Sequence, residues 1–182
     1  MVKRLRNGEN GAMQEFYTLY ADHLTAVCSR YIVDRDDLKD VFQEALIHIF
    51  SHIPDFEYRG PGSLKAWASR IVVNEALDFL KTKKHNQLML TEMGIADVVE
   101  EPDDETLTLS DIPPDVIQQM VKNLPIGYRT VFNLYAFENK SHSEIAHLLG
   151  IKESTSSSQY HRAKNLLANM ISQYINKEQQ SR

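Results

Sequence analysis

Apolar residues recur every three or four positions along most of the chain, which is the spacing that places them on one face of an α-helix. In the first half, this spacing predicts helices over residues 12–31 and 36–53 and a third helix that follows Ser63. All six prolines lie between the periodic stretches, where helix ends tolerate proline and helix interiors do not. No stretch alternates with a period of two for long enough to predict a strand. The chain is therefore predicted to be all-α.

The helical periodicity fails in the middle of the chain and resumes at Val116. Residues 85–124 hold 1 Lys or Arg against 9 Asp or Glu, so the acidic charge is concentrated there. A segment of this composition buries too little apolar area to offset its ordering entropy, and it predicts an acidic linker over residues 85–110. The predicted fold is two small helical domains, 1–84 and 111–182, joined by that linker.

The most specific local pattern is a helix-turn-helix signature over residues 141–167. Ser141 and Glu144 form an S-x-x-E capping box, which predicts a helix start, and Gly150 predicts its end. Ser154 or Thr155 is then expected to cap a second helix, whose N-terminal residues would reach DNA bases in the major groove. An ordinary helical hairpin is the alternative. The polar residues left for the outer surface are Ser156, Ser157, Gln159, His161, Arg162 and Lys164.

Composition and charge limit the size, the location and the partners that can be expected for these domains. A chain of 182 residues fits one ordinary domain or two small ones, and no apolar run approaches the length of a membrane span. The lone Cys28 can form neither an internal disulfide nor a multi-cysteine metal site, and a reducing cytoplasm is the simplest location. The net charge of −5 argues at first against nucleic acid, but residues 125–182 hold 7 Lys or Arg against 4 Asp or Glu.

The motifs in both halves resemble one known family, the extracytoplasmic-function sigma factors, which are small promoter-recognition subunits of bacterial RNA polymerase. In the first half the resemblance rests on DVFQE (40–44), FEYRG (56–60) and WASRIVVN (67–74). In the second half it rests on Leu124-Pro125, Tyr128-Arg129 and residues 141–164. The resemblance covers nearly the whole chain and implies a protein that is not an enzyme and that needs no cofactor or metal.

The resemblance assigns roles to residues of the first domain. The polar face of Asp40, Gln43 and Glu44 corresponds to the surface that binds the clamp helices of the largest polymerase subunit. The loop over residues 56–63 corresponds to the segment that captures a flipped base of the −10 element. Trp67 is expected in the core. The residues implied in −10 binding are Phe56, Tyr58, Arg59, Gly60, Ser63, Arg70, Asn74 and Lys81.

The resemblance also assigns the −35 element to the second domain and implies further partners. The residues implied in −35 binding are Ser156, Ser157, Ser158, His161, Arg162 and Lys164. Relatives commonly carry basic residues where this chain has Ser157 and Gln159, so the −35 contact is expected to be weaker or to read another sequence. The implied partners are core RNA polymerase, through its clamp helices and its flap, promoter DNA, and an anti-sigma factor, which is a family expectation.

Two other classes of function compete with this interpretation. Glu44, His48 and His52 recur every four residues on one helix face, which is also a pattern for a metal-dependent hydrolase. A polymerase-independent helix-turn-helix regulator is the second alternative, and the motifs of the first half weigh against it.

Overall fold

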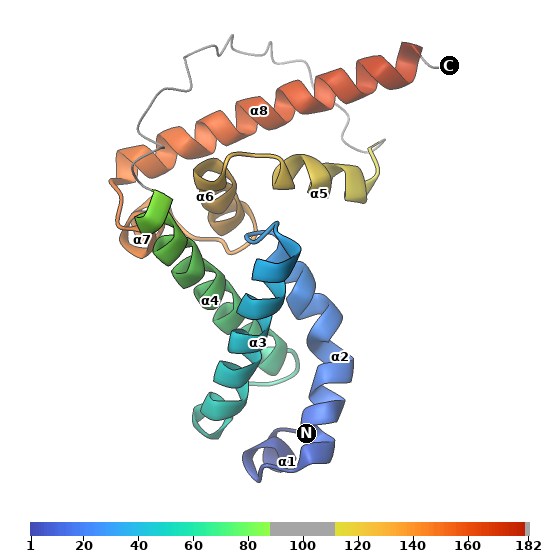
Figure 1. The fold of residues 1–182 in the computed structure, drawn as a ribbon, viewed down its shortest axis with the longest axis vertical. Coiled ribbons are helices and arrows are strands. Elements are labelled where there is room, and N and C mark those ends of the chain that lie inside the picture. The colour runs from blue at the N-terminus through green and yellow to red at the C-terminus, as the bar shows by residue number, and fades with distance from the viewer. Residues whose placement is uncertain (88–111, 181–182) are drawn as a thin grey trace. The chain divides into compact units, whose positions relative to one another are not determined.

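The computed structural model describes residues 1–87 and 112–180, and every regular element within these ranges is a helix (Figure 1). This confirms the all-α prediction. The chain divides into two compact units, Met1–Met89 and Leu90–Arg182, each with its own packing. Of the predicted acidic linker, residues 85–87 belong to the last helix of the first unit, and residues 88–110 lie outside the described ranges.

The first unit contains four α-helices and one short 3₁₀-helix. The predicted 12–31 and 36–53 helices correspond to α2 (Asn10–Ser29) and α3 (Arg35–His52), and the helix after Ser63 is α4 (Ser63–Gln87). The sequence did not predict α1 (Val2–Arg6) or the 3₁₀-helix Ile53–Asp55. Both are shorter than two turns, so neither can display the helical period from which the longer elements were inferred.

Local capping fixes where α3 begins. The Asp34 carboxylate accepts hydrogen bonds from the backbone N–H groups of Asp36 and Asp37, both at 3.0 Å. These bonds satisfy two of the donors that a helix start leaves without intrahelical partners. They hold the pKa of the Asp34 carboxyl below its usual value, with the bond from Asp37 contributing most.

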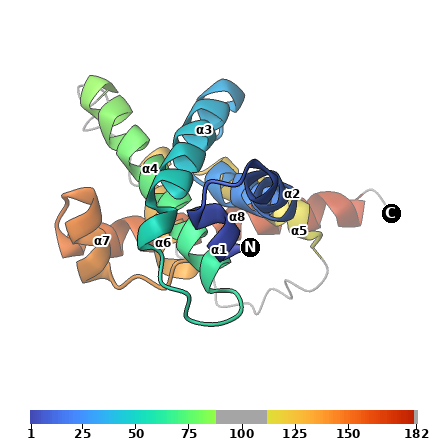
Figure 2. The same cartoon turned by 90° about the horizontal axis from the view of Figure 1, so that it is seen from below.

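The core of the first unit forms where α4 packs against α2 and α3, and Figure 2 shows α4 crossing α3. Phe16, Val41, Ile49 and Val72 are all buried there. Cys28 is buried in the same core, and this burial raises the pKa of its thiol to about 12.

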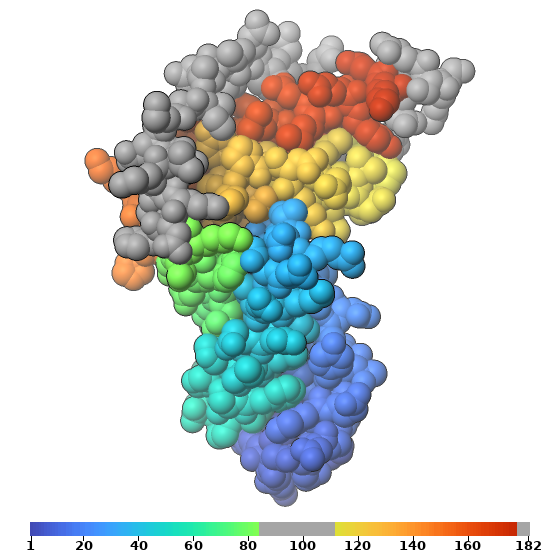
Figure 3. All heavy atoms as spheres, in the orientation of Figure 1, coloured from blue at the N-terminus to red at the C-terminus, as the bar shows by residue number. Residues whose placement is uncertain are grey.

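The described residues of the second unit form α5 (Pro114–Lys122), α6 (Ile126–Ala136), α7 (His142–Leu149) and α8 (Glu153–Gln180). In the space-filling view, the red atoms of α8 lie against the yellow atoms of α5 (Figure 3). Arg129 joins α6 to the end of α5, because its Nη1 donates to the carbonyl oxygens of Lys122 at 2.8 Å and Leu124 at 3.2 Å. A buried guanidinium therefore satisfies carbonyls that the end of α5 leaves open.

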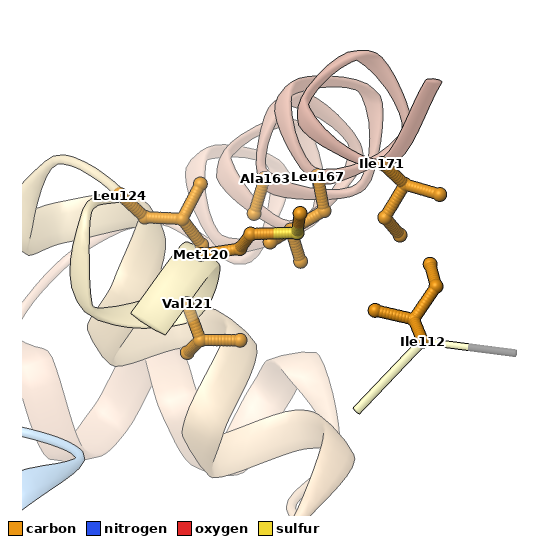
Figure 4. Packing of buried hydrophobic residues seen from close by; sticks show 7 residues of the cluster. All are labelled: Ile112, Met120, Val121, Leu124, Ala163, Leu167 and Ile171. Atoms are coloured by element: carbon orange, nitrogen blue, oxygen red, sulfur yellow. The ribbon is translucent and has the colours of Figure 1, made fainter. Parts of the chain in front are cut away.

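A single apolar cluster holds α5 against α8 (Figure 4). Side chains from α8 face side chains from α5 and from the residues on either side of it. These side chains are aliphatic, apart from the thioether of Met120, so the cluster stabilises the unit through burial of apolar area. The buried members are Ile112, Met120, Val121, Leu124, Ala163, Leu167 and Ile171.

Candidate polymerase and DNA interfaces

The turn between α7 and α8 has the geometry of a helix-turn-helix. The Ser141 hydroxyl accepts from the backbone N–H of Glu144 at 3.2 Å, and the Glu144 carboxylate accepts from the backbone N–H of Ser141 at 2.8 Å. Gly150 ends α7 in the left-handed conformation, with φ of 65° and ψ of 36°. The predicted capping box and the predicted role of Gly150 are both confirmed, because each residue does what its type favours.

The start of α8 differs from the prediction by two or three residues. The helix begins at Glu153, so Ser154 and Thr155 lie in its first turn and cannot cap it. Five of the six residues implied in −35 binding are exposed on this part of the helix. They are Ser157, Ser158, His161, Arg162 and Lys164.

Ser156 does not lie on the outer surface, and its predicted placement there is wrong. Its side chain is 0% exposed, and its hydroxyl lies 3.0 Å from Nδ1 of His142 on α7. Ser156 shares a helix face with Ala163 and Leu167, which are buried. A small polar side chain fits between two close helices when a partner satisfies its hydroxyl, and the sequence alone did not reveal that partner.

Gln159 and Arg162 make contacts with α6 that the sequence did not predict. Gln159 is half-buried, and a Cβ added to Gly127 would lie 3.4 Å from its Nε2 atom. Gln159 is therefore a packing residue. Nη1 of Arg162 donates to the hydroxyl of Tyr128 at 3.3 Å, which gives the exposed guanidinium a fixed neighbour.

An aromatic cluster supports the turn from behind. Tyr160 of α8 lies with its ring centroid 4.3 Å from Tyr135 and 6.0 Å from Phe132, and Tyr135 stacks on His142 at 4.7 Å. These rings join α6, α7 and α8. The spacing of residues within each helix does not reveal this pairing between helices.

The outer face of α3 carries an exposed polar stripe. Asp40, Gln43 and Glu44 are exposed, and none of them makes a hydrogen bond or ion pair with any other described residue. Their spacing of three and four places them on one helix face, whereas Val41 and Ala45 are buried on the other. Ile47 continues the same stripe and is 58% exposed. The stripe is therefore an unpartnered surface of acidic, amide and apolar groups.

Phe56 is not available to DNA, and the expectation that it lies on the DNA-binding surface is wrong. It is 3% exposed and packs on Trp67, with the ring centroids 5.0 Å apart. An apolar ring that directly follows the 3₁₀-helix gains more from burial than from exposure. Trp67, which was expected in the core, is only half-buried, and Phe56 covers one part of it.

The rest of the 56–63 loop is accessible. Tyr58 is 62% exposed, and Arg59 forms an exposed ion pair with Glu57 at 3.1 Å. Gly60 has a φ of 110°, a conformation that other residues rarely adopt. The Ser63 hydroxyl donates to the carbonyl of Gly60 at 2.7 Å and accepts from the Arg59 backbone N–H at 3.3 Å. These bonds fix the loop where it enters α4.

Two of the residues implied in −10 binding, Tyr58 and Asn74, line two different pockets. Tyr58 lines a pocket of about 450 Å³ together with Met1, Val2, Tyr20, Pro61, Gly62 and Leu64. Asn74 lines a pocket of about 240 Å³ between α3 and α4, together with His48, His52, Trp67, Ile71 and Glu75. The structure does not bring the loop and Asn74 to one pocket, although the Phe56–Trp67 contact connects the two regions.

Two basic residues of the implied −10 set lie on α4. Arg70 is exposed, and Lys81 forms an exposed ion pair with Asp78 at 2.8 Å. An exposed ion pair of this kind contributes little to stability, so its lysine can exchange partners at low cost. Both side chains can therefore neutralise phosphate charge.

The residues that suggested a hydrolase are arranged differently from a metal site. Nδ1 of His48 pairs with the Glu75 carboxylate, and Nδ1 of His52 faces the backbone carbonyl of His48 at 2.9 Å. Within the residues that the structure describes, no group of three or more His, Cys, Asp or Glu side chains could hold a metal ion.

Sequence models of two known protein regions match the two units that carry these surfaces. The sequence model for Sigma-70 region 2 matches residues 16–86, and the model for Sigma-70, region 4, matches residues 115–167. The chain belongs to the extracytoplasmic-function sigma factors of the sigma-70 family. As a member, this sigma factor directs transcription initiation by RNA polymerase and is not an enzyme. The region 2 match also argues against the polymerase-independent regulator, and α7 and α8 form the helix-turn-helix of region 4.

Named relatives resemble this sigma factor over almost its whole length. It is 26% identical to "ECF RNA polymerase sigma factor SigW" of Bacillus subtilis (strain 168), with 93% of this chain and 94% of that protein covered. It is also 26% identical to the "ECF RNA polymerase sigma-E factor" of Haemophilus influenzae, with 94% and 93% covered.

Among solved structures, it is similar to the sigma factor RpoE of Bartonella quintana, which was crystallised with the anti-sigma factor NepR. That match has a TM-score of 0.49 and 21% identity, and it covers 87% of this chain and 96% of that one. Within the described ranges, no helix of this sigma factor is long and apolar enough to cross a membrane.

Proposed function

We propose that this sigma factor binds core RNA polymerase through the α3 stripe of Asp40, Gln43 and Glu44. The observation that carries the proposal is that these three exposed polar side chains share one face and have no partner among the described residues. The family resemblance implies the clamp helices of the largest polymerase subunit as the partner of this face. Acidic side chains on α3 complement a basic surface, which favours fast association and a fixed orientation.

The −10 element would be bound by the first unit. Tyr58, with its ring 62% exposed, and the amide of Asn74 supply stacking and hydrogen bonding to unpaired bases. Arg59, Arg70 and Lys81 supply phosphate contacts, which position the strand without reading its sequence. Gly60 and Ser63 contribute by fixing the loop, as their hydrogen bond supports.

The −35 element would be bound by the first turns of α8, and the rest of the second unit would meet the polymerase flap. The exposed side chains that follow Gly150 support this assignment, because a recognition helix reads bases with its N-terminal residues. Ser157, Ser158, His161 and Arg162 are proposed to face bases, and Lys164 to hold phosphate. The family resemblance further implies an anti-sigma factor and a cytoplasmic site of action.

The test is transcription in vitro from a library of randomised promoter fragments, with bacterial core polymerase freed of its own sigma factors. Addition of the full chain should produce transcripts whose start sites share sequence elements about 10 and 35 base pairs upstream. Core polymerase alone and core polymerase with an Asp40→Lys/Glu44→Lys variant are the matched controls. Duplex binding without any chain-dependent transcript would overturn the proposal and favour the polymerase-independent regulator.

A further inference from the structure

The pocket between α3 and α4 combines an aromatic wall with several polar groups. Only one of its lining residues, Asn74, belongs to the set implied in −10 binding. Its volume is about 240 Å³, and the half-buried ring of Trp67 forms one part of its lining. Phe56 supports that ring from the protein interior. Pockets that accept an extruded nucleobase combine a stacking surface with hydrogen-bonding groups for the edge of the base.

The contacts of His52 determine which of its ring nitrogens carries the proton. Its Nδ1 lies 2.9 Å from the backbone carbonyl of His48, which can only accept, so Nδ1 must donate. The Ser51 hydroxyl agrees with this tautomer. It donates its own proton to the His48 carbonyl at 3.1 Å and therefore accepts from Nδ1 of His52, also at 3.1 Å. The neutral His52 ring therefore offers Nε2 as an acceptor.

His48 has the same tautomer for a different reason. Its Nδ1 pairs with the half-buried Glu75 carboxylate, which accepts hydrogen bonds when ionised. In its neutral form, the His48 ring then also offers Nε2 as an acceptor. The two imidazoles line the same pocket, with centroids 6.0 Å apart and planes nearly perpendicular at 87°.

The polar lining of this pocket is therefore rich in acceptors. Besides the two Nε2 atoms, Glu75 contributes carboxylate oxygen, and the Asn74 amide has no hydrogen-bond partner among the described residues. A ligand that suits this lining presents N–H groups. Adenine, cytosine and guanine each carry an exocyclic amine on the edge used in base pairing, whereas thymine presents carbonyl oxygens on both sides of one N–H.

We propose that this pocket holds one unpaired base of the promoter strand that carries an exocyclic amine, and that His48 and His52 determine this preference against thymine. The proposal rests on the proposed function of the first unit in −10 binding. Trp67 provides the stacking surface, Asn74 supplies one further amide contact, and Glu75 acts as a positioning residue that fixes the His48 tautomer.

The experiment measures fluorescence anisotropy of holoenzyme, formed from the full chain and core polymerase, with labelled single-stranded oligonucleotides. The reference probe is a 12-mer of dT, and the test probes carry a single dC or dA at its centre. Two further probes carry 2-pyrimidinone or unsubstituted purine there, which are the same ring systems without the amine. The dC and dA probes should bind about tenfold tighter than all-dT, and the amine-free probes should lose this gain.

Protein variants then assign the preference to the pocket. His52→Phe and the double variant His48→Phe/His52→Phe keep aromatic rings but remove the acceptors, so they should lower the ratio of the dC and dA affinities to the all-dT affinity toward one. His52→Gln restores an acceptor and should recover part of the preference. Tyr17→Phe, on an exposed part of α2 outside this pocket, is the matched control. Helicity and melting temperature report that each variant is folded.

Two results would overturn the proposal. Equal affinity of the wild-type holoenzyme for the dC, dA and all-dT probes would show that the pocket does not read an amine. A preference that survives the double histidine variant would place the reading elsewhere. If chain-dependent transcription persists in either case, the proposed function stands and only this inference fails, whereas loss of all chain-dependent transcription from wild-type protein would refute the proposed function itself.

Discussion

Arg162 and Lys164 lie two residues apart on the exposed part of α8, but their surroundings differ. Nη1 of Arg162 donates to the Tyr128 hydroxyl, whereas Lys164 has no hydrogen bond or ion pair among the described residues. A planar guanidinium with a fixed neighbour can present two parallel donors to guanine, and a flexible ammonium acts as a point charge. The two residues are therefore expected to contribute to DNA binding in different ways.

Alanine substitutions should separate these contributions. Arg162→Ala should cost about 1 to 3 kcal/mol and flatten the preference at one or two positions of the −35 element. Lys164→Ala should weaken binding to all sequences about equally and reduce the salt slope by about one. Both are measured by competition binding of the holoenzyme to a randomised −35 library at several salt concentrations. If the base preferences are unchanged in Arg162→Ala, Ser158 or His161 must contact the bases instead.

The Asp34 carboxyl should make the stability of the folded protein depend on pH in the acid range. Its pKa is lower in the folded protein than in the unfolded chain, where a carboxyl of this type titrates near about 3.9. The contribution of Asp34 to the free energy of unfolding is therefore complete above the pKa that it has in the unfolded chain. It is lost as the pH falls through the lower pKa of the folded protein. Asp34→Asn keeps a side chain that can cap the helix but removes the titration.

The measurement is the melting temperature of the wild type and of Asp34→Asn between about pH 3 and pH 7. The wild type should be more stable at pH 7, and the difference should shrink as the pH falls below about 4. A difference that stays constant over this range would show that the Asp34 charge does not stabilise the start of α3.

At the scale of helices, the α3 stripe should be necessary for polymerase binding and unnecessary for folding. Asp40→Lys/Glu44→Lys reverses two exposed charges that have no partner among the described residues, so helicity and melting temperature should remain nearly unchanged. Binding to core polymerase should be lost, because like charges across an interface cost several kcal/mol. The measurement is copurification with core polymerase, with the exposed Asp22→Lys on α2, which reverses one charge away from the stripe, as a control. Retained affinity in the folded variant would contradict the assignment.

The long helices could be predicted from sequence because their periodicity spans several turns. The starts of α2 and α3 differ from the predicted starts by two residues and one residue, and the capping box of α7 was predicted residue by residue. The features that could not be predicted depend on contacts between elements. Burial of Ser156 against His142, the Arg162 contact with Tyr128 and the pairing of His48 with Glu75 all join residues from different helices.

At the scale of the whole molecule, the two units should fold independently. Each has its own buried core, and each contains about the number of residues from which small domains fold alone. Fragments 1–89 and 90–182, expressed separately, should show helical circular dichroism and cooperative thermal unfolding. A fragment that lacks a cooperative transition, while the full chain has one, would show that its core requires the other unit.

The alternation of buried and exposed positions in the first turns of α8 has a consequence for how promoter choice can change over evolution. Ser157, Ser158 and His161 are exposed, so substitutions there alter what the helix reads without disturbing the core. Ser156 between the helices and Gln159 against Gly127 are held by packing, and a larger side chain at either would shift α8. Descendants of this chain can therefore acquire new target genes through a few surface positions, while the two packed positions next to them stay fixed.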